Sequence, residues 1–323
     1  MRKKRLIICT LAFVVVTISL VILMLYITRS DILYIASYKQ NYSLVSNGDE
    51  EKEFTVPIYV SDKKSFIVNM EKLSNSYVSS FDDSEKIEVK VNKIIDMKNN
   101  KEINNEKYFL YHFIIKINLD IDDEFKIMLS EAYLNIEYPS YEASIVRINI
   151  GSFSYIKVPY YGALNNEISL TKIKPIVNYV GNKKTLVGLN IDFKNNGNQN
   201  IVLKQINIYD SNIYVSTDNI ISKKEEFLSG DNLSKILGYT YLYVDGNYNN
   251  SDINILISGN EEVSYIIPFK YLKECIINKV GFEIVYEINN EVYKLYYTDF
   301  KYFDDNTKTI NDSEFIISSY EQN

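Results

Sequence analysis

The hydropathy pattern begins with one long uncharged stretch near the N-terminus. The 23 residues from Leu6 to Thr28 contain no Asp, Glu, Lys or Arg. A helix of that length rises about 34 Å, and the hydrocarbon core of a bilayer is about 30 Å thick. The β-branched residues in the stretch are no obstacle in lipid, because a helix satisfies all of its own backbone groups. The pattern therefore predicts one transmembrane helix over residues 6–28.

The charges on either side of this stretch predict its orientation. Four basic residues, Arg2 to Arg5, precede it, whereas Arg29 and Asp31 nearly cancel after it. The positive-inside rule then keeps the N-terminus cytoplasmic and sends everything after residue 30 across the membrane. A cleavable signal peptide is the alternative, but it has a shorter apolar region followed by a small-x-small cleavage site, which Leu25 to Arg29 does not offer. We expect a single-pass plasma-membrane protein that keeps its anchor.

Beyond the anchor, the pattern changes to short strands separated by turn residues. Every second residue from Phe109 to Leu119 is apolar, which is the period of a half-buried strand. Asn195-Asn196-Gly197-Asn198 lies between two such runs and indicates a hairpin turn, and Asn289-Asn290 joins two further runs. Many strands without intervening helices predict an antiparallel sandwich architecture.

We therefore predict an all-β ectodomain of two tandem antiparallel β-sandwich-like domains behind one N-terminal transmembrane helix. One larger assembly is the alternative. Polar, turn-rich clusters set the expected boundaries. The expected parts are a cytoplasmic tip with the transmembrane helix (1–30), a connector (31–51), a first β domain (52–160), a second β domain (161–304) and a polar tail (305–323).

Charge and cysteine content limit what the ectodomain can do. Residues 1–30 hold five positive and no negative charges, so removing them changes the net charge from −7 to −12. An acidic surface argues against nucleic acid as a partner, since binding needs basic side chains to displace counterions. Only Cys275 lies outside the predicted membrane segment, so no internal disulfide can form and the ectodomain must be stabilised by burial.

The composition also indicates the source of the chain. It has 29 Tyr and no Trp, and Lys outnumbers Arg by 31 to 4. This is the profile of an AT-rich genome, and we take the host to be a bacterium. Because codon bias explains part of the tyrosine content, tyrosine richness by itself is weak evidence for a ligand-binding surface.

One tyrosine cluster is nevertheless a candidate binding site. Tyr239, Tyr241 and Tyr243 alternate with Thr240 and Leu242, so in a strand their rings share one face. A row of phenols can stack on sugars or pack along an extended peptide, with the hydroxyl groups as polar contacts. The alternative is a cross-strand aromatic ladder that only fills the sheet face.

Catalytic and metal chemistry have little support in the sequence. The ectodomain holds one histidine, one cysteine and one arginine, namely His112, Cys275 and Arg147. These are the residue types of a sortase-like cysteine transpeptidase, but that family has Thr-Leu-x-Thr before the cysteine and its arginine after it, and this chain has neither. Zinc needs more imidazole or thiolate ligands than are present. The acidic run 120–124 lacks the glycine that a calcium-binding EF-hand loop requires, so we expect no metal and no cofactor.

The expected function follows from the anchor, the acidic β-rich ectodomain and the lack of a catalytic motif. We expect a membrane-anchored extracytoplasmic binding or adaptor protein of the bacterial cell envelope, one possible setting being a transport or secretion complex. Its expected partners are the membrane, through residues 6–28, and another envelope protein or a wall polymer. The alternative is a cell-envelope enzyme that acts on wall sugars or peptides.

Overall fold

The computed structural model describes most of the chain after the predicted anchor. The described residues are 32–47, 51–117, 124–141, 145–158, 167–180, 183–210, 212–217, 220–222, 252–272, 276–297, 300 and 310–321. Most of them lie in strands of several sheets, so the prediction of an all-β, sandwich-like fold is confirmed. Within these ranges no helix is long and apolar enough to cross a bilayer, and the predicted span 6–28 lies outside them.

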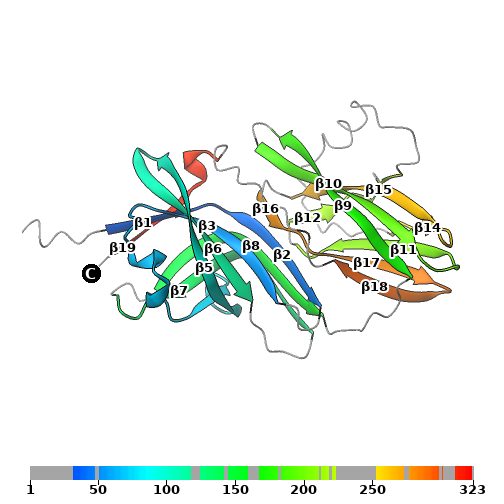
Figure 1. Cartoon of the computed structure of the whole chain (residues 1–323), viewed down its shortest axis with the longest axis horizontal. Helices are drawn as coiled ribbons and strands as arrows, with labels where there is room; N and C mark the ends of the chain where they lie inside the picture. The colour runs from blue at the N-terminus through cyan, green and yellow to red at the C-terminus, as the bar shows by residue number, and fades with distance from the viewer. Residues whose placement is uncertain are drawn as a thin grey trace, which may run out of the picture.

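A curled sheet, which we call the first module, forms one half of the molecule (Figure 1). The strand order is β16-β2-β8-β7-β4-β5-β6-β3-β1-β19. Two residues separate β1 from β2 along the chain, although they lie toward opposite ends of this order, so the sheet curls around one core. Its own strands are β1 (Ile32–Ser37), β2 (Gln40–Asn47), β3 (Lys52–Val60), β4 (Ser76–Ser79), β5 (Lys86–Ile103), β6 (Glu106–Ile117), β7 (Phe125–Glu137), β8 (Ile145–Val158) and β19 (Ile316–Glu321).

Two sheets packed on a common core form the second module. One has the order β12-β15-β10-β9 with β13 beside β15, and the other has the order β14-β11-β17-β18. Phe193 of β10 and Phe269 of β15 share this core with Ile206 of β11 and Phe282 of β17. The strands are β9 (Ile168–Val180), β10 (Lys183–Asn195), β11 (Ile201–Ile208), β12 (Ile213–Val215), β13 (Ile221–Ser222), β14 (Ile255–Ile257), β15 (Glu262–Tyr271), β17 (Phe282–Ile288) and β18 (Glu291–Tyr297).

Most of the segment predicted as a connector, residues 31–51, consists of strands. It contains β1 and β2, and β2 is buried on both faces. Tyr42 and Leu44 lie in the core of the first module. Asn41 and Ser43, on the opposite face, make hydrogen bonds to the second module. The polar positions that resembled a connector are therefore one face of a buried strand.

The end of the predicted polar tail, 305–323, also belongs to the first module. β19 pairs antiparallel with β1 along its length, with Ile32 opposite Glu321. Phe315 packs edge-to-face on Tyr38 and Tyr59, at ring-centroid distances of 5.8 and 5.2 Å. The first and last described strands are therefore neighbours at the same end of the molecule.

A main-chain ladder joins the two modules. β16 (Ile276–Lys279), which lies between β15 and β17 along the chain, pairs in parallel with β2, and β2 pairs in parallel with β8. These parallel pairs depart from the antiparallel pattern that we predicted. Gly281 lies against β2 so closely that a Cβ there would be 2.6 Å from Cγ2 of Val45. The sheet of the first module thus includes one strand, β16, from the part of the chain that forms the second module.

Buried side chains complete this junction. The carbonyl of Tyr209 accepts hydrogen bonds from the hydroxyls of Ser43, at 2.9 Å, and Ser154. The amide of Asn41 donates to both carboxylate oxygens of Asp210, at 2.9 and 3.0 Å. Because breaking buried polar contacts leaves groups without partners at a cost of about 1–3 kcal/mol each, this interface favours one arrangement of the modules.

Candidate functional site

Several residues singled out in the sequence lie outside the part of the chain that the structure describes. They include the candidate binding residues Tyr239, Tyr241 and Tyr243, together with Cys275 and residues 120–123 of the acidic run. The tyrosine row therefore stays a prediction. In the described ranges, no group of three or more His, Cys, Asp or Glu could hold a metal ion.

His112 and Arg147 are not brought together. His112 lies on β6 and is 8% exposed, whereas Arg147 lies on β8, and β7, β4 and β5 stand between these two strands in the sheet order. The guanidinium of Arg147 binds main-chain carbonyls, as described next. The cysteine-transpeptidase arrangement has no support in this geometry.

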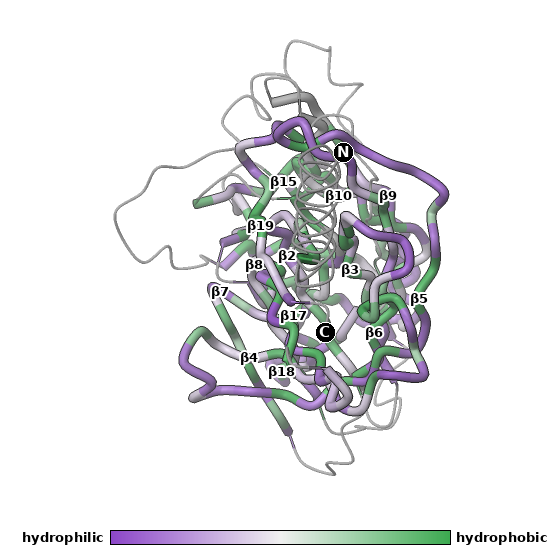
Figure 2. Tube along the Cα trace, turned by 90° about the vertical axis from the view of Figure 1, so that its left-hand side faces the viewer, coloured by the Kyte–Doolittle hydropathy of each residue, from purple (hydrophilic) through white to green (hydrophobic). Residues whose placement is uncertain are grey.

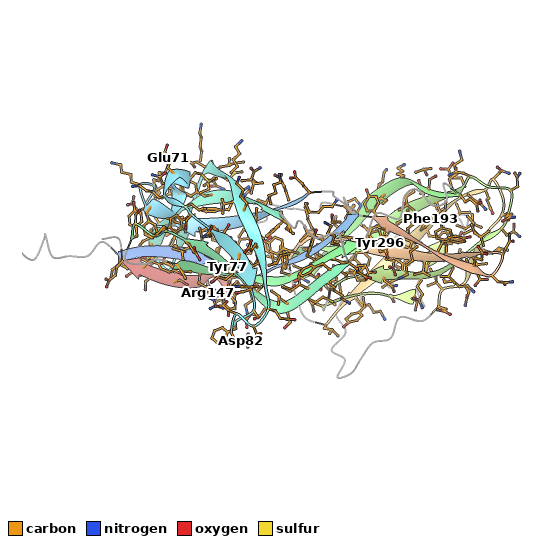
Figure 3. The ribbon with its side chains drawn as sticks, turned by 90° about the horizontal axis from the view of Figure 1, so that it is seen from below. Glu71, Tyr77, Asp82, Arg147, Phe193 and Tyr296 are labelled. Carbon is orange, nitrogen blue, oxygen red and sulfur yellow. The ribbon has the colours of Figure 1, made fainter. Side chains whose placement is uncertain are left out.

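The most distinctive surface feature is the turn between β4 and β5, which carries an exposed aromatic ring. We call residues 79–85 the Phe81 turn. The side chain of Phe81 is 72% exposed, the largest exposure among the large hydrophobic residues described. Single exposed apolar side chains are common; this one differs in how firmly its backbone is held. Figure 3 places Tyr77, Asp82 and Arg147 on one flank of the first module, away from Phe193 and Tyr296 in the second.

Arg147 fixes the backbone of the Phe81 turn. Its Nη2 donates to the carbonyls of Ser80 and Phe81, at 2.8 and 2.6 Å. The guanidinium carbon lies 4.4 Å from the ring centroid of Tyr133 and 5.5 Å from that of Phe81, so the cation faces two aromatic rings. Tyr133 and Phe81 are themselves in contact, with ring centroids 5.8 Å apart. The phenyl ring therefore projects from a preorganised platform.

Two carboxylates within the turn also hold its shape. Asp83 forms an ion pair with Arg147 at 3.5 Å and accepts a hydrogen bond from the hydroxyl of Ser79 at 2.5 Å. Asp82 accepts hydrogen bonds from the hydroxyls of Ser80 and Ser84, both at 2.7 Å. These hydrogen bonds lower the pKa of Asp82 to about 2, so Asp82 stays ionised at physiological pH.

This arrangement has the features of a protein-contact surface. An exposed aromatic ring on a rigid turn loses little conformational freedom on binding, which is the property of good interface anchors. Arg147 is neutralised by Asp83, whereas Asp82 and Glu85 add two further negative charges to the turn, which we call its negative rim. The complementary surface is an apolar pocket with basic residues at its edge. The sequence did not indicate this site, because Ser79-Ser80-Phe81-Asp82-Asp83-Ser84 has the composition of an ordinary polar turn and Arg147 is distant in sequence.

Comparisons with known proteins assign the chain to no family. No family model matches it, and no curated protein matches it. Three solved structures with weak similarity are a protein of unknown function from Porphyromonas gingivalis W83, the adhesin CfaE of enterotoxigenic E. coli and the C-terminal domain of the Streptococcus pyogenes antigen I/II-family protein AspA. Their identities are 9%, 9% and 8%, and each match covers 82% of this chain. The matches cover 99%, 85% and 99% of those chains, with TM-scores of 0.19, 0.19 and 0.18, and similarity at this level carries no functional argument.

Proposed function

We propose that this chain is a membrane-anchored, extracytoplasmic binding or adaptor protein of the bacterial cell envelope. Residues 6–28 hold it in the plasma membrane, the N-terminus is cytoplasmic, and the two modules are tandem β domains on the outer side. The uncharged N-terminal stretch and the four basic residues before it support this topology. An accessory role in a transport or secretion complex is the setting that we favour.

The Phe81 turn is the observation that carries the binding role. Its phenyl ring is exposed while its backbone is held by Arg147 and its acidic rim by serine hydroxyls. We propose that the ring enters an apolar pocket on another envelope protein, with basic residues of that protein facing Asp82 and Glu85. The buried junction between the modules keeps this surface in a constant position relative to the second module.

Protease protection tests the proposed topology. Protease added to wall-stripped intact cells should digest the modules, because they are on the outer side, and should leave only the N-terminal anchor segment. A cytoplasmic protein in the same cells serves as the control and should stay intact. Modules that are digested only after the membrane is permeabilised would contradict the topology.

In-membrane photocrosslinking tests the binding role. A photoreactive phenylalanine analogue replaces Phe81 in the full chain, expressed in its own host, and adducts are identified by mass spectrometry. A matched control carries the analogue at Val292, which is 62% exposed on β18. We expect one defined envelope-protein adduct at position 81 and none at 292. Arg147→Gln should weaken that adduct because it frees the two turn carbonyls.

Two results would count against the proposed binding surface. Equal adduct patterns at positions 81 and 292 would mean that the phenyl ring has no specific partner. An adduct at position 81 that persists unchanged in the presence of Arg147→Gln and Asp82→Asn would mean that neither the bracing nor the negative rim contributes to binding.

A further inference from the structure

The end of the first module that carries β1 lies close to the membrane if the proposed anchor holds. β1 begins at Ile32, and the predicted span ends at Thr28, so three residues connect them. The extended chain from Thr28 to Ile32 spans at most about 14 Å. The headgroup layer outside the hydrocarbon core is itself about 5–8 Å thick. The start of β1 must therefore lie in or just above that layer.

The contacts of β1 show which other segments share this end. The amide of Tyr34 donates to the hydroxyl of Ser61 at 3.0 Å, and the amide of Ser61 donates to the carbonyl of Tyr34 at 3.0 Å. Ser61 begins the segment 61–73, which holds η1 (Phe66–Val68) and η2 (Met70–Lys72). Phe66 stacks on Tyr141 at a centroid distance of 4.3 Å, which places the start of β8 nearby. We call Ile32, residues 61–73 and Ile145 the anchor-side end, and Figure 2 looks onto it.

The chemistry of the anchor-side end suits a lipid headgroup layer. Three of its apolar side chains are solvent-exposed, Ile32 at 48%, Ile145 at 44% and Met70 at 38%. Segment 61–73 carries three lysines against two acidic residues, and the neighbouring Glu321, which lies opposite Ile32, balances the remaining positive charge. The residues after the anchor have a net charge of −12 in all, so this end repels anionic lipid less than the rest of the surface does. Lysine stems can lie along the interface with their ammonium groups at phosphates.

We propose that the anchor-side end rests in the outer headgroup layer and holds the first module against the membrane. The short tether fixes its distance, and Ile32, Met70 and Ile145 enter the interface. The second module then projects away from the bilayer, because it lies at the opposite end of the long axis (Figure 1). This inference rests on the proposed anchor and adds a specific lipid-contacting surface to it.

Fluorescence quenching in vesicles tests this surface. The full chain, with Cys9→Ser and Cys275→Ser, carries one labelled cysteine, either Met70→Cys or, as the control, Leu256→Cys, which replaces a residue that is 57% exposed on β14. Each protein is reconstituted in vesicles of phosphatidylcholine with a minor share of phosphatidylglycerol and a nitroxide on some headgroups. We expect loss of most of the fluorescence at position 70 and none at 256. A flexible Gly-Ser insertion of about ten residues after Asp31, which lengthens the tether, should restore the fluorescence at position 70.

The possible outcomes separate this inference from the anchor itself. Protein that floats with the vesicles but shows equal, weak quenching at both positions would overturn the membrane-resting end and leave the anchor intact. Quenching at position 70 that survives the insertion would overturn the role of the short tether. Protein that fails to float with the vesicles would overturn the anchor and this inference together.

Discussion

At the scale of single residues, Glu283 connects the second module to the junction. It is 2% exposed, and it accepts hydrogen bonds from the hydroxyl of Tyr209 at 2.6 Å and the amide of Asn207 at 3.0 Å. Lys294 lies 3.1 Å from its carboxylate. Burial is the largest single effect and raises the pKa of Glu283, but the hydrogen bonds and the charge of Lys294 together lower this pKa below its usual value. Glu283 is therefore held ionised. It binds the hydroxyl of Tyr209, the residue whose carbonyl accepts a hydrogen bond from Ser43 of the first module.

Glu283→Gln should remove a pH-dependent part of the stability. Because the folded-state pKa is lowered, the carboxylate stabilises the fold at neutral pH, and this contribution is lost as the pH falls through the folded-state pKa. We expect the substitution to cost about 1–3 kcal/mol at neutral pH and to flatten the fall in unfolding free energy on acidification. Urea denaturation of the detergent-solubilised full chain over a pH series measures both, with Glu88→Gln at an exposed position of β5 as the control. An acid slope identical to that of the unsubstituted protein would contradict this assignment.

At the scale of elements, local turn chemistry was predictable and strand partnership was not. Asn289 and Asn290 have φ of 51° and 67° and join β17 to β18 as predicted, since asparagine tolerates the left-handed conformation that such hairpins need. The hairpin predicted at 195–198 is wrong, because β10 and β11 belong to different sheets. Asn195 there donates to carbonyls of Gln199 and Ile257. A turn sequence specifies a bend, whereas burial on the shared core decides which strands pair.

Besides pairing with β1, β19 contacts β8 through the hydroxyl group of one residue. β2 pairs with β8 only from Gly151 onward, so the start of β8 has an edge that β2 does not cover. The hydroxyl of Tyr320 donates to the carbonyl of Arg147 at 2.7 Å and accepts from its amide at 3.1 Å. β19 thereby holds the backbone of the residue that braces the Phe81 turn.

Tyr320→Phe should therefore weaken the first module and loosen the Phe81 turn. Loss of two hydrogen bonds to partly buried main-chain groups should cost about 1–3 kcal/mol. Hydrogen exchange followed by mass spectrometry should show faster exchange in peptides that cover residues 79–85. Tyr141→Phe, where the ring stacks on Phe66, is the matched control and should leave that exchange unchanged. Equal exchange in both variants would mean that Arg147 holds the turn without help from β19.

At the scale of the whole molecule, the sequence indicated a large β-rich part but not how its halves are joined. The junction uses Ser43, Ser154 and Gly281, small residues with no periodic signal of their own. These small residues let backbones approach, and their partners lie more than fifty residues away in the chain. The anchor, by contrast, is a local property of hydropathy, so it could be predicted from sequence, and it stays a prediction because residues 6–28 lie outside the described ranges.

A graded series at Gly281 tests whether close backbone contact holds the modules in one arrangement. A Cβ at this position would lie 2.6 Å from Cγ2 and 3.0 Å from the backbone nitrogen of Val45, so Gly281→Ala must displace β2 slightly and Gly281→Val must displace it further. At Gly197, a Cβ would be no closer than 3.6 Å to any neighbour, which makes Gly197→Ala the matched control. Spin labels on Lys90→Cys and Leu256→Cys, in the chain that carries Cys9→Ser and Cys275→Ser, report the distance between the modules.

We expect a narrow distance distribution for the unsubstituted chain and for Gly197→Ala, and a broader one for the two Gly281 variants, in the order of side-chain size. Parallel pairing of β16 with β2 spans only a few residues, so it cannot hold the modules once the side-chain hydrogen bonds of Asn41 and Ser43 are pulled apart. If Gly281→Val unfolds the chain, Asn41→Ala, which removes only the contact with Asp210, is the milder variant and should also broaden the distribution. If the distance distributions of Gly281→Val and Asn41→Ala are as narrow as that of the unsubstituted chain, the rigid arrangement does not depend on this junction.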